Sequence, residues 1–114
     1  MALNDTILNV GADAMRAAMT HIAIHTANPE PTGTNPATSA RVVASWPAAS
    51  GGDLTISNKA FTGGAANGPA TYVGFWSAIT GGVFYGSVAL TGDTTFNSAG
   101  EYTITSLTVN GSST

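Results

Sequence analysis

The sequence predicts a mainly β fold, an antiparallel β-sandwich or jelly-roll-like domain with one short N-terminal helix. Three observations support this prediction. About seven short segments rich in β-branched and aromatic residues recur at regular spacing, and glycine-rich turns separate them. A single segment near the N-terminus has helical spacing instead. The chain has 114 residues, the length of one domain, and a domain of this size buries roughly two-thirds of the surface of its extended chain.

The segment Leu3 to Met19 is expected to be the helix. Asn4, Asp5 or Thr6 can cap its N-terminus, whereas Gly11 weakens it. An apolar stripe with approximate helical spacing runs along it: Leu3, Ile7, Met15, Ala18 and Ile22. This stripe either lies on the sheet, the commoner outcome, or is presented to a partner, so residues 1–20 form the expected helix and docking segment.

The first strand is expected at Thr20 to Thr26, where histidine and threonine alternate with aliphatic residues. His21 and His25 then share one face of this strand. The next segment, Ala27 to Pro36, contains three prolines and Gly33 and is predicted to be a loop. Such a loop is either a surface contact arm or a plain connector.

The remaining strands follow from alternating or β-branched runs bounded by turn residues. They are Arg41–Trp46, Asp53–Phe61, the two arms of a hairpin within Ala70–Leu90, a short strand around Thr94–Phe96, and Glu101–Val109 with Tyr102, Ile104 and Leu107 as its buried positions. Residues 21–109 thus form the expected β-sandwich, and Asn110 to Thr114 a flexible tail of the single domain 1–114.

The central hairpin has the densest aromatic content in the chain and reverses at Thr80-Gly81-Gly82. In its first arm Tyr72, Gly74 and Trp76 fall on one face and Val73, Phe75 and Ser77 on the other. Neither face is polar. We therefore expect the hairpin to be covered on both sides, the alternative being that one face is a mildly apolar exposed surface.

The composition excludes several classes of function. Only 8% of residues are charged, the net charge is −3, and the fixed cations are Arg16, Arg41 and Lys59. Binding to nucleic acid or to an anionic membrane surface is therefore not expected. The chain has no cysteine, which removes disulfides and thiolate chemistry. The N-terminus does not resemble a secretory signal, so synthesis without export by that route is expected.

No constellation predicts catalysis or metal binding. His21 and His25 would lie about 13 Å apart on an extended strand at ~3.3 Å per residue, too far to share one metal ion. Asp53, Asp93 and Glu101 adjoin predicted turns, and nothing in their spacing selects a catalytic pair. We predict a protein that is not an enzyme, with no catalytic, cofactor-binding or metal-binding residues.

Exposed aromatic rings could stack on sugars, and Trp46, Trp76 and Tyr85 are the candidates. A β-sandwich carrying them would be a plausible lectin-like scaffold. In a chain with so few large residues, however, these rings are expected to fill the core instead.

Three segments together carry a family resemblance: HIAIHTANPEPTG from His21, ARVVASWPAASGGDLTISN from Ala40, and VGFWSAITGGVFYGSVALTGDTTFNSAGEYTI from Val73. They resemble a family of small tailed-bacteriophage virion proteins, labelled tail-fibre or minor tail proteins and in some phages placed on the head. The resemblance implies a β-rich structural subunit of the virion without catalytic residues. The sequence lacks the triple-helical or coiled-coil stalk of a long fibre.

We therefore expect a virion protein made in the host bacterial cytoplasm, in first place a decoration or cement protein bound to the major capsid protein on the outside of the head. The alternative partners are tail proteins, for a minor tail, tail-tip or tail-fibre component. Carbohydrate or host-surface binding is a third reading. Leu3–Met19 and Ala27–Pro36 are the expected docking elements. A homo-oligomer is expected, with a trimer as the first guess.

Overall fold

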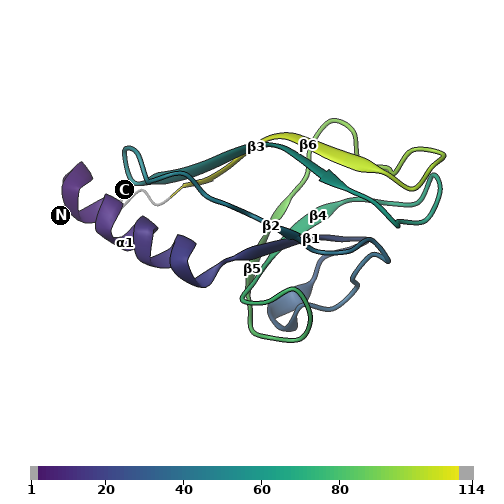
Figure 1. Ribbon diagram of the computed structural model, residues 1–114, viewed down its shortest axis with the longest axis horizontal. Helices are drawn as coiled ribbons and strands as arrows, with labels where there is room; N and C mark the ends of the chain where they lie inside the picture. The colour runs from purple at the N-terminus through teal and green to yellow at the C-terminus, as the bar shows by residue number, and fades with distance from the viewer. Residues whose placement is uncertain (1–2, 111–114) are drawn as a thin grey trace.

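The computed structural model describes residues 3–110. The predicted tail, Asn110 to Thr114, begins one residue too early, because Asn110 still belongs to the last strand, where it pairs with Asp53. The rest of that tail, residues 111–114, lies outside the described residues. The elements in chain order are α1 (Asp5–Ala18), β1 (His21–His25), the 3-10 turn η1 (Glu30–Thr32), β2 (Val42–Val43), β3 (Asp53–Phe61), β4 (Tyr72–Trp76), β5 (Phe84–Ala89) and β6 (Tyr102–Asn110) (Figure 1). The predicted helix and the predicted strand Asp53–Phe61 are both confirmed, the latter with identical bounds.

The strands form two antiparallel sheets, which confirms the predicted β-sandwich. The larger sheet has the order β2-β1-β4-β5, and the smaller consists of β3 and β6. Both long strands of the smaller sheet run along the long axis of the molecule, whose extents are 46 × 27 × 22 Å (Figure 1). The helix lies at one end of this axis, beside the start of β3.

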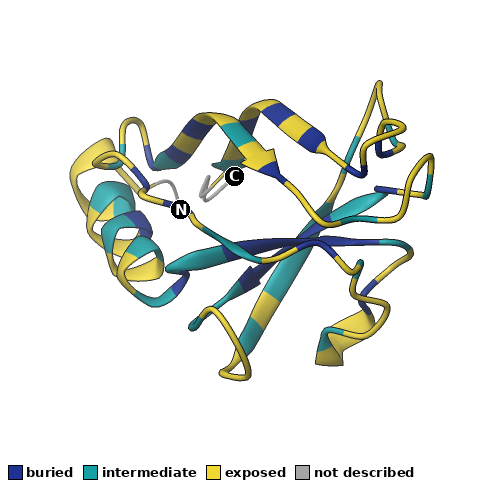
Figure 2. Cartoon of the chain, turned by 45° about the vertical axis from the view of Figure 1, so that its right-hand side comes forward, coloured by how far each residue is buried: buried dark blue, intermediate teal, exposed yellow. Residues whose placement is uncertain are grey.

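The core fills the space between the two sheets. The larger sheet contributes alternate residues of β1 and β4, namely Ile22, Ile24, Val73 and Phe75. Buried and exposed residues also alternate along β3 and β6 (Figure 2). Their buried side chains are Leu54, Ile56, Phe61, Tyr102, Ile104 and Leu107. The three buried positions predicted for the last strand are thus confirmed.

The alternation along β3 changes phase at Asn58. Leu54 and Ile56 are buried, but beyond Asn58 the buried residue is Phe61, at an odd position. Asn58 has a left-handed backbone, with φ of 55°, a conformation that asparagine tolerates better than most residues. This one residue lets both halves of a nine-residue strand face the same core.

The central hairpin is confirmed as β4 and β5, and Gly81 and Gly82 have the positive φ values, 60° and 76°, that its reversal requires. A bulge between Phe75 and Trp76 shifts the register, so that Trp76 pairs with Phe84. Phe84 thereby lies on the same face as Trp76, which is the face turned away from the core.

Two predicted strands differ from the structure. Arg41–Trp46 forms a ladder only at Val42–Val43, because Ser45 has a φ of 50° that breaks the extended path. No strand forms at Thr94–Phe96 in the described chain: Thr95 makes an isolated bridge with Pro69, while its N–H and hydroxyl donate to the Asp93 carboxylate. The local side-chain bond competes with a ladder. The described residues therefore hold six strands, one fewer than predicted.

Helix α1 is attached to the sandwich by one side. Asn4 caps it by accepting a hydrogen bond from the Ile7 N–H at 3.2 Å. Ala12 is buried against the body, and two polar side chains on this side accept backbone hydrogen bonds from the turn before β3, Asn9 from Gly52 at 2.8 Å and Asp13 from Ala49 at 3.0 Å. The predicted stripe residues Leu3, Ile7 and Met15 are exposed instead of lying on the sheet.

Candidate functional site

The outer face of the larger sheet is covered by the proline-rich loop at residues 27–36. Pro29, which belongs to the loop, is fully buried. The loop is joined to the end of β1 by a bridge between Pro36 and His25. A Cβ atom added to Gly33 would lie 2.6 Å from the Trp76 ring, so the loop backbone lies directly against the indole. The hairpin is therefore covered on both sides, as predicted.

His25 is fully buried under this loop, and both of its ring nitrogens are used. Nδ1 lies 2.8 Å from the Thr34 carbonyl, which can only accept, so Nδ1 carries the proton. Nε2 then accepts from the Trp76 indole N–H at 3.4 Å. Burial lowers the pKa of His25, because the imidazolium would lose its hydration there. His25 is thus a neutral structural residue.

The two histidines do not form a metal site. Nδ1 of His21 is 2.8 Å from the Thr20 hydroxyl, whereas His25 bonds to the loop and to Trp76. Within residues 3–110, no group of three or more histidine, cysteine, aspartate or glutamate side chains could hold a metal ion.

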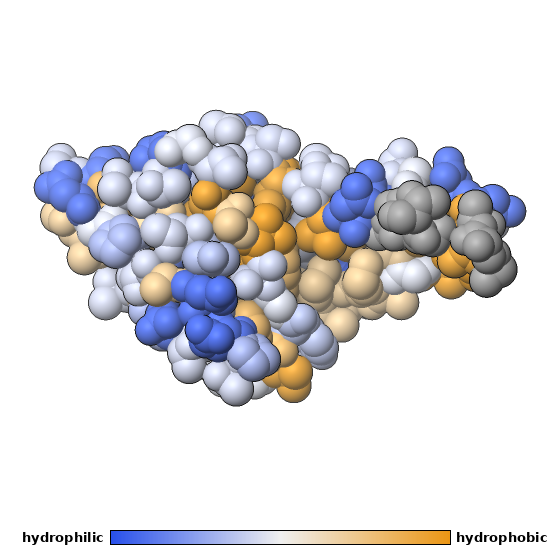
Figure 3. Space-filling view, turned by 180° about the vertical axis from the view of Figure 1, so that it is seen from behind, coloured by the Kyte–Doolittle hydropathy of each residue, from blue (hydrophilic) through white to orange (hydrophobic). Residues whose placement is uncertain are grey.

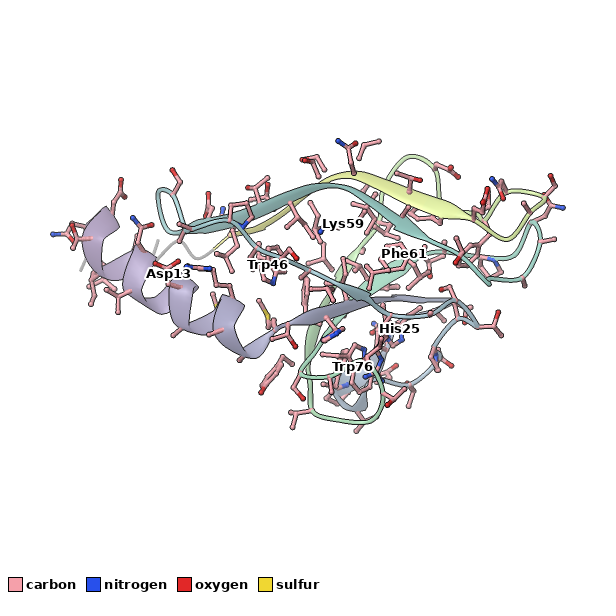
Figure 4. The ribbon with its side chains drawn as sticks, in the orientation of Figure 1. Asp13, His25, Trp46, Lys59, Phe61 and Trp76 are labelled. Carbon is pink, nitrogen blue, oxygen red and sulfur yellow. The ribbon has the colours of Figure 1, made fainter. Side chains whose placement is uncertain are left out.

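Trp76 is half-buried and packs against side chains of its own chain. The Arg41 guanidinium carbon lies 3.7 Å from the centroid of its ring, and the Phe84 ring centroid lies 5.1 Å away. Arg41 also donates to the carbonyls of Ala78 and Gly81, at 2.8 and 2.7 Å, and so ties the hairpin loop to the indole. Figure 4 shows Trp76 beside His25, on the opposite side of the larger sheet from Phe61.

The other two aromatic candidates for sugar stacking differ in their exposure. Trp46 is only 7% exposed and its indole N–H donates to the Met19 carbonyl at 2.8 Å, so it is a core residue (Figure 4). Tyr85, at 49% exposure, remains accessible. The prediction that these rings fill the core is therefore confirmed for Trp46 and wrong for Tyr85, while Trp76 is half-buried under the loop on the outer face of the larger sheet.

Two of the predicted acids line one open hollow of about 670 Å³ at the end of the sandwich opposite α1. Asp93 accepts from Thr95, and Glu101 accepts from the Asn97 side chain at 3.2 Å. Tyr102 donates its hydroxyl to the Asp93 carbonyl, and burial raises the pKa of that phenol. Asp53 lies at the far end of β3, where it pairs with Asn110. The carboxylates of Asp93 and Glu101 thus make hydrogen bonds within turns, as their positions predict.

The cations are likewise bound to neighbouring groups of the chain. Arg16 forms an ion pair with Asp13 at 2.8 Å, Arg41 lies on Trp76, and the Lys59 ammonium donates to the Val43 carbonyl at 3.4 Å across the edge of the two sheets. None of the three belongs to a cluster of positive charge. In the described part of the chain no helix is long and apolar enough to cross a membrane.

Exposed large apolar side chains lie on α1 and also elsewhere in the described chain, at Val43, Ile79, Val83 and Tyr85. Ile7 and Val10 are 48% and 59% exposed, and Ala14 and Ala17 continue the same side of the helix. We call these four residues the α1 stripe. The stripe predicted from the sequence contains only Ile7 of these four residues, although the helical spacing of Val10, Ala14 and Ala17 could have identified the other three.

The comparisons with known proteins agree with the resemblance seen in the sequence. A family model described as podophage GP4 fiber I protein gp80 matches residues 2–112, nearly the whole chain. No curated protein and no solved structure matches it.

Proposed function

Because the chain belongs to the family of podophage GP4 fiber I protein gp80, we propose that it is a non-enzymatic structural subunit of a fibre on the tail of a phage particle. The family match over residues 2–112 is the observation that carries this proposal. The match supports the broader statement that the chain is a fibre-like virion component. Its location on the tail is our proposal.

The geometry supports a structural role. The side chains most suited to chemistry each make a structural contact: His25 holds the loop to Trp76, Asp13 bonds to the turn before β3, and Asp93 bonds to Thr95 in the segment after β5. Their hydrogen bonds hold turns and loops against the sheets. This is the organisation of a compact assembly unit, whose surfaces matter more than any single pocket.

The sequence alone favoured decoration of the head because the chain has no long stalk. The family description instead favours the alternative, a tail or fibre component. A domain that is 46 Å long, helix included, does not need to be the shaft of a fibre, since it can instead be an attachment or tip domain. We therefore propose the fibre and give decoration of the head second place.

The proposal is tested by locating the chain on the phage particle. Purified particles are labelled with an antibody to this chain and imaged by electron microscopy, with isolated tails and empty heads as separate samples. We expect label on tail-associated fibres and none on empty heads. Label spread over the heads would overturn the fibre proposal and support decoration.

A further inference from the structure

A second hollow, of about 450 Å³, borders Trp76. Residues from the segment 36–41, which leads into β2, and from the β4–β5 loop contribute to its lining. Most of these residues are apolar, and the hydroxyl and charged groups among them belong to Ser39, Thr80 and Arg41. We call it the Arg41 hollow. An apolar wall with a few polar groups is the usual lining of a site for a small ligand.

The guanidinium of Arg41 is held in a fixed position, and one of its edges is unused. Its Nη1 donates to the carbonyls of Ala78 and Gly81, at 2.8 and 2.7 Å. The indole of Trp76 lies against its flat face, with the guanidinium carbon 3.7 Å from the ring centroid. Its Nη2 and Nε make no hydrogen bond with residues 3–110. These two atoms present the parallel pair of N–H groups that binds both oxygens of a carboxylate.

The chain itself provides no anion for Arg41. No carboxylate of residues 3–110 lies within ion-pair distance of it, whereas Arg16 is paired with Asp13 at 2.8 Å. Burial lowers the pKa of the Arg41 guanidinium, and no neighbouring acid offsets this effect. Only 8% of the residues are charged, and Figure 3 shows mostly side chains of intermediate or apolar hydropathy on the face seen from behind. A partly buried cation is stabilised by an anion, so Arg41 is suited to an anionic ligand.

Ser39 gives a second, independent indication of a ligand. It lies in the wall of the Arg41 hollow, and its side chain is only 9% exposed. Its hydroxyl is the only buried side-chain oxygen or nitrogen in residues 3–110 that lacks a hydrogen-bond partner. The backbone is fixed on both sides of it, because the Thr38 hydroxyl donates to Gly63 and the Ala40 N–H donates to Thr62. Since buried hydroxyls are normally bonded, a ligand in the hollow would supply the partner.

The make-up of the Arg41 hollow favours a sugar acid among carboxylates. A hexuronic acid has a carboxylate for Arg41 and ring hydroxyls for Ser39 and Thr80. The C–H groups of its ring suit the apolar part of the wall, which includes Pro36 and Ile79. An aliphatic or aromatic acid would leave both protein hydroxyls without partners. The volume of about 450 Å³ is also within the usual range of small-ligand sites.

We propose that the Arg41 hollow binds a hexuronic acid residue of an acidic polysaccharide. The carboxylate lies on the Nη2 and Nε edge of Arg41, and a ring hydroxyl bonds to Ser39. Trp76 positions Arg41 and does not stack on the sugar, because the guanidinium already occupies one face of its ring. The site goes beyond the proposed function and does not depend on it, since a single copy of the chain forms it.

The first test is an NMR titration of the full chain with the methyl glycosides of glucuronic and galacturonic acid. Methyl glucoside and methyl galactoside are the matched controls, since they differ only by a CH₂OH group in place of the carboxylate. We expect one of the uronides to shift the Trp76 indole N–H signal and to bind at least about tenfold more tightly than its control. The indole N–H of Trp46, bonded in the core to Met19, should not shift. Binding of neither uronide, or equal binding of uronide and control, would overturn the proposal.

The second test removes the cation. Arg41→Gln should weaken uronide binding at least about tenfold, and Arg41→Lys should also weaken it because lysine lacks the parallel pair of N–H groups. Lys59→Gln is the matched control: it removes the same charge outside the hollow and should change the affinity less than about twofold. Equal weakening by Arg41→Gln and Lys59→Gln would mean that only the net charge of the chain matters, and the site would be wrong.

The third test, Ser39→Ala, separates binding from folding. Because the Ser39 hydroxyl has no partner in residues 3–110, its removal should not lower the melting temperature of the ligand-free chain. It should nevertheless weaken uronide binding about three- to tenfold. A lower melting temperature with an unchanged affinity would show that the hydroxyl serves the fold, and would overturn the placement of the sugar.

A carboxylate at the end of a polypeptide is the competing ligand, and N-acetylalanine is its probe. Tighter binding of N-acetylalanine than of the uronides would overturn the sugar assignment. The fibre proposal fails separately from this one. Label on fibres without uronide binding would leave the fibre role intact and overturn the site, whereas uronide binding with label on heads would do the reverse.

Discussion

The two segments expected to dock, the loop at residues 27–36 and helix α1, differ in what covers them. The loop lies on its own sheet, with Pro29 buried and the Thr34 carbonyl bonded to His25. The helix instead keeps Ile7 and Val10 exposed. The loop, rich in proline and short of secondary structure, thus completes the fold, while the regular helix leaves an apolar side open. Irregular structure alone is a poor guide to a contact surface.

The reason lies in the outer face of the larger sheet. Gly74 leaves space for the His25 ring there, since a Cβ at Gly74 would come within 2.5 Å of Nε2. Trp76 and Phe84 supply apolar area beside it, and the loop covers all three rings. The side of α1 that faces the sandwich is instead held by three hydrogen bonds, made by the side chains of Asn9, Asp13 and Arg16, and by the small residue Ala12. Four substitutions or conditions test this difference.

The largest effect is expected for Trp76→Ala, which removes the ring that His25, Arg41 and Phe84 contact. We expect a loss of about 3 kcal/mol in the free energy of unfolding, at the low end for a tryptophan because the ring is half-buried. Urea denaturation measures it. Ile79→Ala in the adjacent exposed loop should change stability by less than about 0.5 kcal/mol. Equal effects of the two would mean that the loop is not packed on Trp76.

A smaller loss, about 2 kcal/mol, is expected for Gly33→Ala. The new methyl would meet the Trp76 ring at 2.6 Å and would also force a non-glycine residue to keep a φ of 80°. Gly51→Ala is the control, since Gly51 has a φ of 59° but no atom within 4 Å of its added Cβ. The Ala37 N–H, which follows the loop, donates to the Ile24 carbonyl, so its rate of hydrogen exchange measures how often the loop opens. Similar losses in both variants would leave backbone strain as the sole cause.

The loop should also respond to pH. Burial lowers the pKa of His25 in the folded state, so the unfolded chain binds the proton more readily. Stability is therefore full above the unfolded pKa of about 6.5 and falls as the pH decreases toward the folded pKa, by no more than about 1.4 kcal/mol per pH unit. Urea denaturation at pH 7 and pH 5 measures the change. A His25→Gln variant with the same decline as the parent would show that His25 is not its source.

The smallest effect concerns the helix. Gly11→Ala should stabilise the monomer by about 0.5–1 kcal/mol, because alanine favours a helix interior and no atom lies within 4 Å of the added Cβ. Thermal unfolding at a concentration too low for assembly measures it. Destabilisation would mean that the helix is not formed at Gly11 in the isolated chain.

Local pattern predicted most of the sandwich. Asp53–Phe61 could be placed because alternation and flanking glycines agree, and the hairpin because Gly81 and Gly82 follow an aromatic run. The absence of a strand at Thr94–Phe96 could not be predicted in this way, since the Asp93 side chain competes for the backbone N–H of Thr95. Ser45 likewise shortens β2, because its backbone has a left-handed conformation that cannot be predicted from a serine in the sequence.

Which side chains are exposed at the surface was less predictable than the strands, because the burial of a side chain depends on tertiary contacts. Nothing local distinguishes His25, which is fully buried, from His21, which is partly exposed on the same strand face. The loop that covers His25 is nine residues away at Thr34. For α1 the helix itself was evident, but which side meets the body depends on Gly52 and Ala49, two backbone donors in a distant turn.

The alignment of β3 and β6 with the long axis has a mechanical consequence. Their hydrogen bonds run across that axis, as in any antiparallel ladder, from Asp53 and Asn110 at the α1 end to Phe61 and Tyr102 at the other. A tensile load applied between the two ends would shear this ladder, so its bonds would carry the force together instead of parting one at a time. The subunit should therefore be stiffest along its own long axis.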